Sequence, residues 1–161
     1  ENDNIIGSKE RGTLDENDIY RVTALWITNS KGQILLAQRH RNKKHHPLMW
    51  GPAVAGTVDE GETYEQNIIK EADEELGIRN SKFNIGPKTR TSNQYNHFTQ
   101  WYTLSLDKSD SEFKIQEDEV EQVKWFDKDE LLKKIDTNND EFLPKMKKYL
   151  ELFSGPEKLE N

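Results

Sequence analysis

Three glutamates are spaced so that their carboxylates could act together. Glu71, Glu74 and Glu75 stand at positions i, i+3 and i+4 of a segment with helical periodicity, and this spacing puts the side chains on one face of a helix. Like charges this close repel, and nothing basic is placed within the cluster to relieve them. Hard oxygen ligands gathered in this way suit Mg²⁺ or Mn²⁺, which reach out to substrate phosphates. The alternative is an ordinary solvated helix face, because charged runs are usually exposed.

The helix that must position these glutamates has recognisable ends. Thr63 and Gln66 have the form of a capping box, in which a hydroxyl caps the first turn and the residue three positions on reaches back. Gly77 follows as a C-terminal cap. Between these ends the apolar residues fall within one arc, namely Tyr64, Ile68, Ile69, Ala72 and Leu76. We therefore predict a helix that begins after Thr63 and ends before Gly77.

The spacing of residues around this helix resembles the motif of the Nudix hydrolase family. That motif reads G-x5-E-x7-R-E-U-x-E-E-x-G-U, where U is an aliphatic residue. The chain matches it with Gly56, Glu62 and the run Lys70-Glu71-Ala72-Asp73-Glu74-Glu75-Leu76-Gly77-Ile78. Every fixed position matches, except that Lys70 stands where the family has arginine and Ala72 is a small version of U. Because the spacing is fixed over the whole match, chance is a poor explanation for it.

This resemblance implies both a fold and a chemistry. The family has an α/β fold, an α/β/α sandwich around a mixed β-sheet, and its motif forms a loop–helix–loop that holds a divalent metal. By the same resemblance the catalytic and metal-binding residues are Glu71, Glu74 and Glu75, with Mg²⁺ or Mn²⁺ as the metal. The implied activity is hydrolysis of a diphosphate linkage in a nucleoside-diphosphate-like or related small molecule.

The remaining motif positions have structural roles in the family. Gly56 and Gly77 match backbone turns, and Glu62 matches a carboxylate at the helix entry. Lys70 matches an arginine that braces the carboxylates. Because lysine is a point charge without the guanidinium fork, the resemblance implies looser bracing in this chain.

Outside the motif, the chain resembles the isopentenyl-diphosphate isomerase-like branch of the same family. The residues that carry this likeness are Tyr20-Arg21, Trp26, Asn29 to Gln33, Leu35-Leu36, Gln38-Arg39, Lys43-Lys44, Pro47 and Trp50. Isomerase activity is therefore an alternative function. A third alternative is a Nudix-like module that senses a nucleotide without turning it over, which predicts damaged metal ligands.

The site residues favour a hydrolase over the isomerase. The isomerase uses a cysteine in the strand that enters the motif and histidines on two strands as metal ligands. This chain has Ala55, Thr57 and Tyr20 at those positions, and it contains no cysteine. It keeps all three glutamates of the hydrolytic motif, some of which the isomerase lacks. The intact glutamates argue against the sensing module as well.

A basic segment follows the second predicted strand. Arg39, Arg41, Lys43 and Lys44 are concentrated there in a chain that is acidic overall. We predict that they bind the substrate diphosphate, and a solvated loop is the alternative. The candidates for the general base are the motif glutamates and three acidic residues of a later loop, Glu117, Glu119 and Glu121.

The remaining elements follow from residue type and apolar spacing. Runs of β-branched and aromatic residues predict strands at 19–28, 33–39, 98–106 and 123–126. Apolar spacing after an aspartate predicts helices at 127–135 and 140–153. No repeat or linker divides the chain. The predicted organisation is an N-terminal arm over 1–18, a single Nudix hydrolase domain over 19–153 and a C-terminal tail over 154–161.

The composition of the chain excludes some classes of binding partner. The 161 residues have a net charge of −7, and a field of that sign repels nucleic-acid phosphates. No apolar run approaches the roughly 18 residues of a membrane span, and the polar first residues do not resemble a signal peptide. The absence of cysteine weakly favours a reducing compartment. We expect a cytoplasmic protein that acts on a small-molecule diphosphate and binds neither nucleic acid nor membrane, and a homodimer is compatible with these observations.

Overall fold

The computed structural model describes residues 2–10, 12–92 and 95–154, and its centre is a mixed seven-stranded sheet. The strands lie in the order β3-β2-β1-β6-β5, with β4 beside β1 and β7 beside β2. Their bounds are β1 Tyr20–Thr28, β2 Ile34–Arg39, β3 Trp50–Pro52, β4 Val54–Thr57, β5 Asn84–Ser92, β6 Asn96–Ser105 and β7 Val120–Phe126. β1 and β6 run parallel, and the other pairs are antiparallel.

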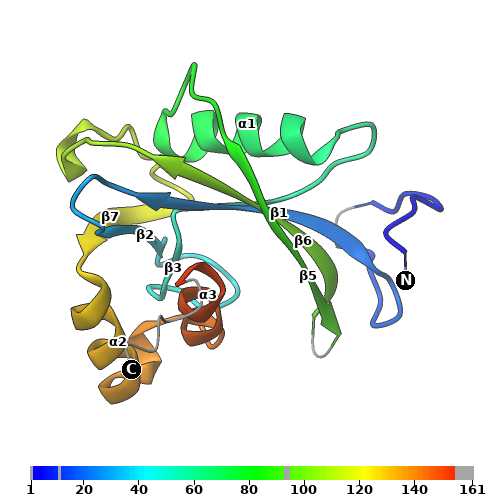
Figure 1. Cartoon of the computed structure of the whole chain (residues 1–161). Coiled ribbons are helices and arrows are strands. Elements are labelled where there is room, and N and C mark those ends of the chain that lie inside the picture. The colour runs from blue at the N-terminus through cyan, green and yellow to red at the C-terminus, as the bar shows by residue number, and fades with distance from the viewer. Residues whose placement is uncertain (1, 11, 93–94, 155–161) are drawn as a thin grey trace, which may run out of the picture.

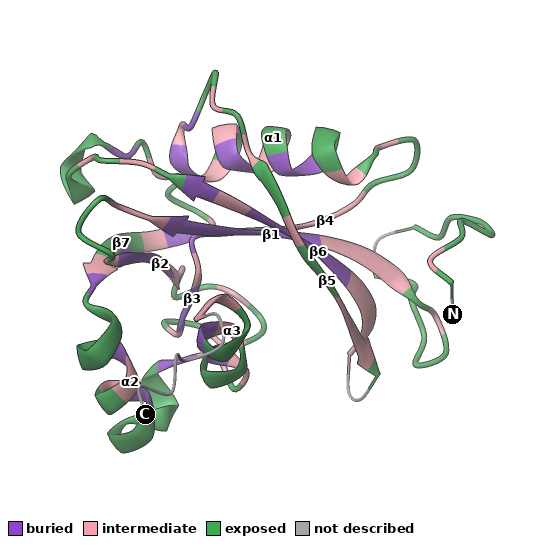
Figure 2. Ribbon diagram, viewed as in Figure 1, coloured by how far each residue is buried: buried purple, intermediate pink, exposed green. Residues whose placement is uncertain are grey.

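Helices cover both faces of this sheet (Figure 1). They are α1 (Tyr64–Leu76), α2 (Lys128–Thr137) and α3 (Met146–Phe153). Because side chains alternate along a strand, Leu25 and Ile27 of β1 pack on the α1 side, whereas Ala24 and Trp26 pack with α2 and α3. The buried segments in Figure 2 follow this layering. The expected α/β fold, with helices on both sides of a mixed sheet, is confirmed.

β1 changes partner along one of its edges, and this change opens the sheet. Residues 22–25 pair with β4, whereas Ile27 and Thr28 pair with β2. β2 then continues past β1 and pairs with β3 through residues 36–38. The sheet therefore divides between β1–β4 on one side and β2–β3 on the other, and β4 lies beside α1 at this division.

The strand β5 is absent from the expectations drawn from sequence. All of its residues are exposed or half-buried, and its pairing with β6 is irregular between Ile85 and Lys88, where the intervening residues are glycine and proline. An edge strand of this kind lacks the apolar alternation by which buried strands are recognised. β1, β2, β6 and β7 were all expected, although β6 and β7 begin earlier than predicted.

The prediction of one helix over 140–153 is wrong. A short 3-10 turn (Asn139–Glu141) is followed by extended chain, and α3 begins only at Met146. Pro144 accounts for the break, because proline disfavours helical geometry in the residue before it. Leu143, which is that residue, donates its N–H to the carbonyl of Trp50 at 2.9 Å. The preceding helix, expected at 127–135, is confirmed as α2.

The carboxylate of Asp3 ties the N-terminal arm to the domain. Asp3 accepts hydrogen bonds from Arg21 Nε at 2.8 Å, from Tyr64 Oη at 3.0 Å and from Lys88 Nζ at 2.5 Å. Burial by itself raises the pKa of the Asp3 carboxyl, but these donors outweigh it and hold the pKa below its usual value. Asp3 therefore joins the arm to β1, α1 and β5.

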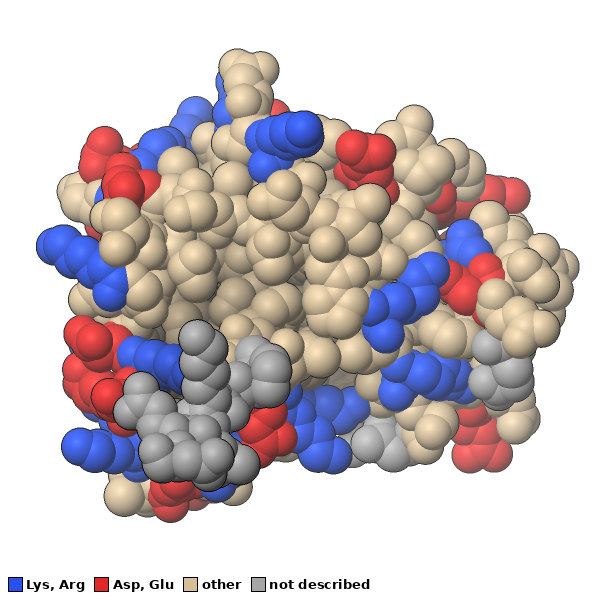
Figure 3. Space-filling view, viewed as in Figure 1, with Lys and Arg blue, Asp and Glu red and all other residues tan. Residues whose placement is uncertain are grey.

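The surface of the domain carries many charged side chains (Figure 3), as the composition leads one to expect. In Figure 3 the charged side chains lie around the rim of the visible face, and its centre is uncharged. Among the described residues, no helix is long and apolar enough to cross a membrane. Of the predicted C-terminal tail, only Ser154 falls within the described residues.

Candidate active site

The helix that carries the three glutamates has the predicted caps. Thr63 Oγ1 accepts from the N–H of Gln66 at 3.1 Å, and Gln66 Oε1 accepts from the N–H of Thr63 at 2.9 Å. At the other end Gly77 takes a left-handed conformation with φ 65° and donates its N–H to the carbonyl of Asp73. A side chain is disfavoured there, because few residues other than glycine adopt positive φ readily. The helix therefore begins and ends where the sequence predicts.

The buried face of α1 differs from the predicted one. Its buried residues are Asn67, Ile68, Ala72 and Leu76, whereas Ile69 is half exposed, at 50 %. The buried face of α1 thus includes Asn67 and leaves out Ile69, contrary to the arc expected from sequence. This places a polar amide in the interface between α1 and the sheet.

Gly56 of β4 lies directly against Glu71. A Cβ at position 56 would lie 2.4 Å from Cγ and Cδ of Glu71 and 2.5 Å from its Oε1. Real Cβ atoms essentially never show contacts under 3.0 Å, so the Glu71 carboxylate occupies space that any other residue would fill. The glycine at this motif position therefore lets the helix bring a carboxylate onto the backbone of β4.

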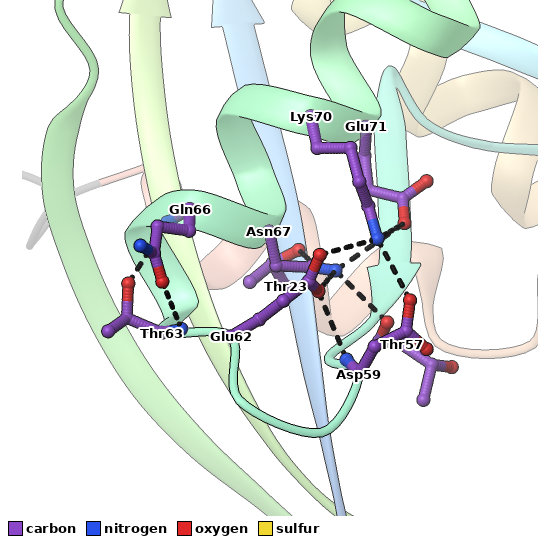
Figure 4. A network of polar contacts seen from close by, with 9 residues as sticks. All are labelled: Thr23, Thr57, Asp59, Glu62, Thr63, Gln66, Asn67, Lys70 and Glu71. Atoms are coloured by element: carbon purple, nitrogen blue, oxygen red, sulfur yellow. Dashed lines mark hydrogen bonds and ion pairs between the residues drawn. The ribbon is translucent and has the colours of Figure 1, made fainter.

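Lys70 is bound to the loop that precedes α1. Its Nζ lies 2.7 Å from Glu62 Oε1, 2.9 Å from Asp59 Oδ2 and 3.8 Å from Glu71 Oε1 (Figure 4). Burial lowers the pKa of Lys70, but the bonds to Glu62 and Asp59 outweigh it and raise the pKa. The expectation that nothing basic relieves the cluster is therefore wrong at Glu71. A long lysine side chain can reach back over the preceding turn. The position of Lys70 around the helix axis therefore does not show where its charge lies.

Asn67 is the site residue that sequence reasoning missed. Its side chain is fully buried, and Nδ2 donates to the carbonyl of Thr57 at 3.0 Å and to Glu62 Oε2 at 2.9 Å, with Glu71 Oε1 at 3.4 Å. On the opposite side, Thr23 Oγ1 donates to Asn67 Oδ1. The sequence signal that could have identified Asn67 is its position one helical turn before Glu71, which puts its amide on the same face of the helix.

Glu75 lies beside Glu71 in a poorly solvated position. Burial and the negative charge of Glu71 raise its pKa to about 8, although the N–H of Ala55 and the charges of Lys43 and Arg39 oppose the shift. The division of the sheet explains the contact with Ala55, because the edge of β4 there faces α1 rather than β2. Glu71 and Glu75 are thus brought together at this edge.

Glu74 is placed apart from that pair. It is exposed and lines a surface hollow together with Asp73, Arg79 and Gln116. Across the described residues, no group of three or more histidine, aspartate or glutamate side chains is arranged to hold a metal ion. The oxygen donors of Glu71 and Glu75 nevertheless fit Mg²⁺ or Mn²⁺ in kind. A third ligand from Glu74 would require its side chain to turn toward them.

The four basic residues at the end of β2 and in the loop after it divide into two pairs. Arg39 is half-buried and donates from Nε to the carbonyl of His45 at 3.0 Å. Burial lowers the pKa of Arg39, whereas the charge of Glu75 opposes this shift. The charge of Lys43 also acts on Glu75, while its ammonium pairs with Glu119. Arg39 and Lys43 therefore belong to the surroundings of Glu75.

The other two basic residues lie farther out. Arg41 is exposed and makes two side-chain hydrogen bonds to Glu121, and Lys44 is exposed. Two of the three acidic candidates for the general base are thus engaged by this loop, because Glu119 pairs with Lys43 and Glu121 with Arg41. Glu117 is exposed.

Replacing Gly56 with alanine should disturb the site more than the fold. The new Cβ must displace the Glu71 carboxylate, so we expect Mn²⁺ affinity, measured by titration calorimetry, to fall about tenfold or more. Gly7→Ala is the matched control, because nothing lies within 4 Å of a Cβ there. Equal Mn²⁺ affinity in Gly56→Ala and wild type would contradict this account of the glycine.

Comparison with known proteins places the chain among characterised folds. A protein of Deinococcus radiodurans (DR0079), known from a crystal structure, superposes with a TM-score of 0.79 at 22% sequence identity, covering 92% of both chains. At this identity the likeness shows the fold. An isopentenyl-diphosphate Delta-isomerase of Klebsiella pneumoniae matches only in part, with 32% identity over 63 residues, 39% of this chain and 34% of that protein.

Family membership rests on longer matches. An uncharacterized Nudix hydrolase of Listeria monocytogenes is 29% identical over 119 residues, which is 73% of this chain and 69% of that protein. The model of the NUDIX domain matches residues 19–146, a range that includes Gly56, Gly77 and every motif residue between them. The chain therefore belongs to the Nudix hydrolase family, enzymes that cleave acid anhydrides in pyrophosphate-containing substrates.

Proposed function

We propose that this chain hydrolyses the diphosphate linkage of a nucleoside-diphosphate-like or related small molecule, with Mg²⁺ or Mn²⁺ held by Glu71, Glu74 and Glu75. The observation that carries the proposal is the placement of Glu71 against Gly56 of β4, with Glu75 one helical turn on, where burial and the charge of Glu71 raise the pKa of Glu75. Two carboxylates held together in a poorly solvated place favour a bound cation, since a cation removes their mutual repulsion.

The side chains around this pair have separate tasks in the proposed reaction. When bound, a divalent cation neutralises the diphosphate and stabilises the negative charge of the transition state. The N–H of Ala55 holds the Glu75 carboxylate, and Lys70 holds Glu62 and the loop before α1. Fixed ligands of this kind need no reorganisation as charge develops, which is the main source of catalysis in phosphoryl transfer.

Arg39 and Lys43 are the best supported of the four proposed diphosphate contacts. Both exert their charge on Glu75, so a diphosphate that reaches the carboxylates also meets these cations. Arg41 and Lys44 are less suited, because both are exposed, whereas Arg39 and Lys43 are half-buried. We assign diphosphate binding chiefly to Arg39 and Lys43, with Arg41 and Lys44 as outer contacts.

The partial match to the Klebsiella isomerase supports membership of the isopentenyl-diphosphate isomerase-like branch, without the isomerase reaction. Ala55 offers only a methyl group at the position where the resemblance to the isomerase branch implies a cysteine. The ring of Tyr20 packs against His97 with centroids 5.2 Å apart, and the carbonyl of Thr57 accepts from Asn67. These residues supply neither the acid nor the imidazole ligands for proton transfer at carbon.

Removing one carboxylate charge should abolish most of the activity. Glu75→Gln and Glu74→Gln are expected to lower kcat on the best substrate by about a hundredfold or more, with the far-ultraviolet circular dichroism spectrum unchanged. Glu65→Gln is the control, since Glu65 is exposed in the first turn of the same helix. Wild-type turnover in both test variants would show that the metal site is wrongly assigned.

Neutralising the inner cations should affect substrate binding. Arg39→Ala and Lys43→Ala are expected to raise KM about tenfold, because a hydrogen bond to a charged group contributes roughly 1.5–3 kcal/mol, and to weaken its dependence on salt. Smaller effects are expected for Arg41→Ala and Lys44→Ala. If KM is unchanged in all four variants, this segment is a solvated loop.

The chain should lack useful isomerase activity. Incubation with isopentenyl diphosphate and Mg²⁺, followed by chromatographic detection of dimethylallyl diphosphate, should reveal no isomer above the level of a protein-free control. Isomer formed at about 1 per second or faster, an ordinary enzymatic rate, would replace the hydrolase proposal by the isomerase.

A further inference from the structure

We propose that Asn67 is a positioning residue for Glu71, and that Asn67 and Lys70 together brace the carboxylates as one arginine at position 70 could. This inference rests on the proposed function, because Glu71 is one of the proposed metal ligands. It adds a residue that the family motif leaves unspecified, since position 67 falls within the seven variable residues between Glu62 and Lys70.

Lys70 contacts Glu71 less closely than it contacts the loop before α1. Its ammonium makes close contacts with Glu62 and Asp59, at 2.7 and 2.9 Å, but lies 3.8 Å from Glu71 Oε1. At 3.8 Å the contact between Lys70 and Glu71 is an ion pair, because this distance exceeds the range of a hydrogen bond. A lysine ammonium concentrates its charge at one point, and here that point lies at the entry loop.

Asn67 reaches the oxygen that Lys70 does not reach by a hydrogen bond. Its Nδ2 lies 3.4 Å from Glu71 Oε1 and 2.9 Å from Glu62 Oε2 (Figure 4). Lys70 contacts the other oxygen of Glu62, Oε1. The amide and the ammonium therefore share both carboxylates, with Glu62 held between them. An arginine has five N–H donors in a fixed fork and could serve both acids from one side chain.

The sheet fixes which way the amide points. Thr23 of β1 donates from Oγ1 to Asn67 Oδ1, and the carbonyl of Thr57 on β4 accepts from Nδ2. With the oxygen occupied on one side, the two N–H donors must face Thr57 and the carboxylates. Aspartate at position 67 would put a third negative charge against Glu62 and Glu71, and an apolar residue would remove the amide donor that Asn67 supplies to them.

A double-mutant cycle between positions 67 and 70 tests the assignment. The measured quantities are Mn²⁺ affinity, by calorimetry, and the melting temperature of the metal-free protein. Asn67→Ala should weaken Mn²⁺ binding about tenfold or more, as loss of a group that orients a metal ligand does. In the Lys70→Arg background the same change should weaken binding several-fold less, because the guanidinium reaches Glu71. The loss of melting temperature should be similar in both backgrounds.

Two further variants separate positioning from general stability. Gln66→Ala removes half of the capping box and should lower the melting temperature while leaving Mn²⁺ affinity unchanged. Thr23→Val removes the hydroxyl that orients the amide, keeps nearly the same volume, and should weaken Mn²⁺ binding in the same direction as Asn67→Ala. Thr23→Val supplies the affinity comparison if Asn67→Ala does not fold.

The outcomes distinguish this inference from the proposed function. Mn²⁺ binding that is tight in wild type and lost in Glu75→Gln, yet unchanged in Asn67→Ala or Thr23→Val, would overturn the role of Asn67 and leave the proposed function intact. An equal loss of affinity for Asn67→Ala in the Lys and Arg backgrounds would overturn the shared bracing. Wild-type protein that binds no Mn²⁺ would overturn both.

Discussion

The Glu71 carboxylate occupies the space that a Cβ of residue 56 would fill, and the arrangement of the site depends on this contact. For the contact to exist, β4 must lie under α1 and carry glycine at the crossing point. β1 provides the support, because residues 22–25 hold β4 in antiparallel register. The same strand sends Thr23 into the interface, where its hydroxyl meets Asn67. The opening in the sheet is thus built from one strand that changes its partner.

Electrostatics explains why so polar a site can be held between a helix and a sheet. Carboxylates withdrawn from water are costly unless they are paired or hydrogen-bonded. Glu62 meets this requirement with Lys70, Asn67 and the N–H of Asp59, and these donors outweigh burial and lower its pKa. Glu75 meets it less fully, and burial beside Glu71 raises its pKa to about 8. The repulsion that remains between Glu71 and Glu75 lies where the proposed cation and diphosphate would arrive.

Local chemistry made much of this structure predictable. The capping box and Gly77 define the ends of α1, because each cap depends on residues within a few positions. The α/β fold followed from resemblance to the family motif, and most strands followed from their β-branched residues. Pro144 is a local signal against one continuous helix from 140 to 153, because proline disfavours helical geometry in the residue before it. β5 carries no comparable local signal, because an exposed edge strand needs little apolar alternation.

Contacts between distant segments were beyond the sequence pattern. Arg41 and Glu121 pair across 80 positions of the chain, and Asn67 is recognised as a site residue only once Thr23 and Thr57 surround it. Helical spacing correctly grouped Glu71 with Glu75, but it could not show that Glu74 turns outward or that Lys70 reaches back to Glu62. The direction of a long side chain is set by its partners in space.

The most direct test of this account is the position of Mn²⁺ in crystals soaked with the ion, located from its anomalous scattering. The account predicts a peak beside Gly56 that is coordinated by the carboxylates of Glu71 and Glu75 and by Glu74 turned toward them, with Asn67 still bonded to Glu62. A peak that avoids both carboxylates, or soaked crystals in which this edge of β4 binds no Mn²⁺, would contradict it.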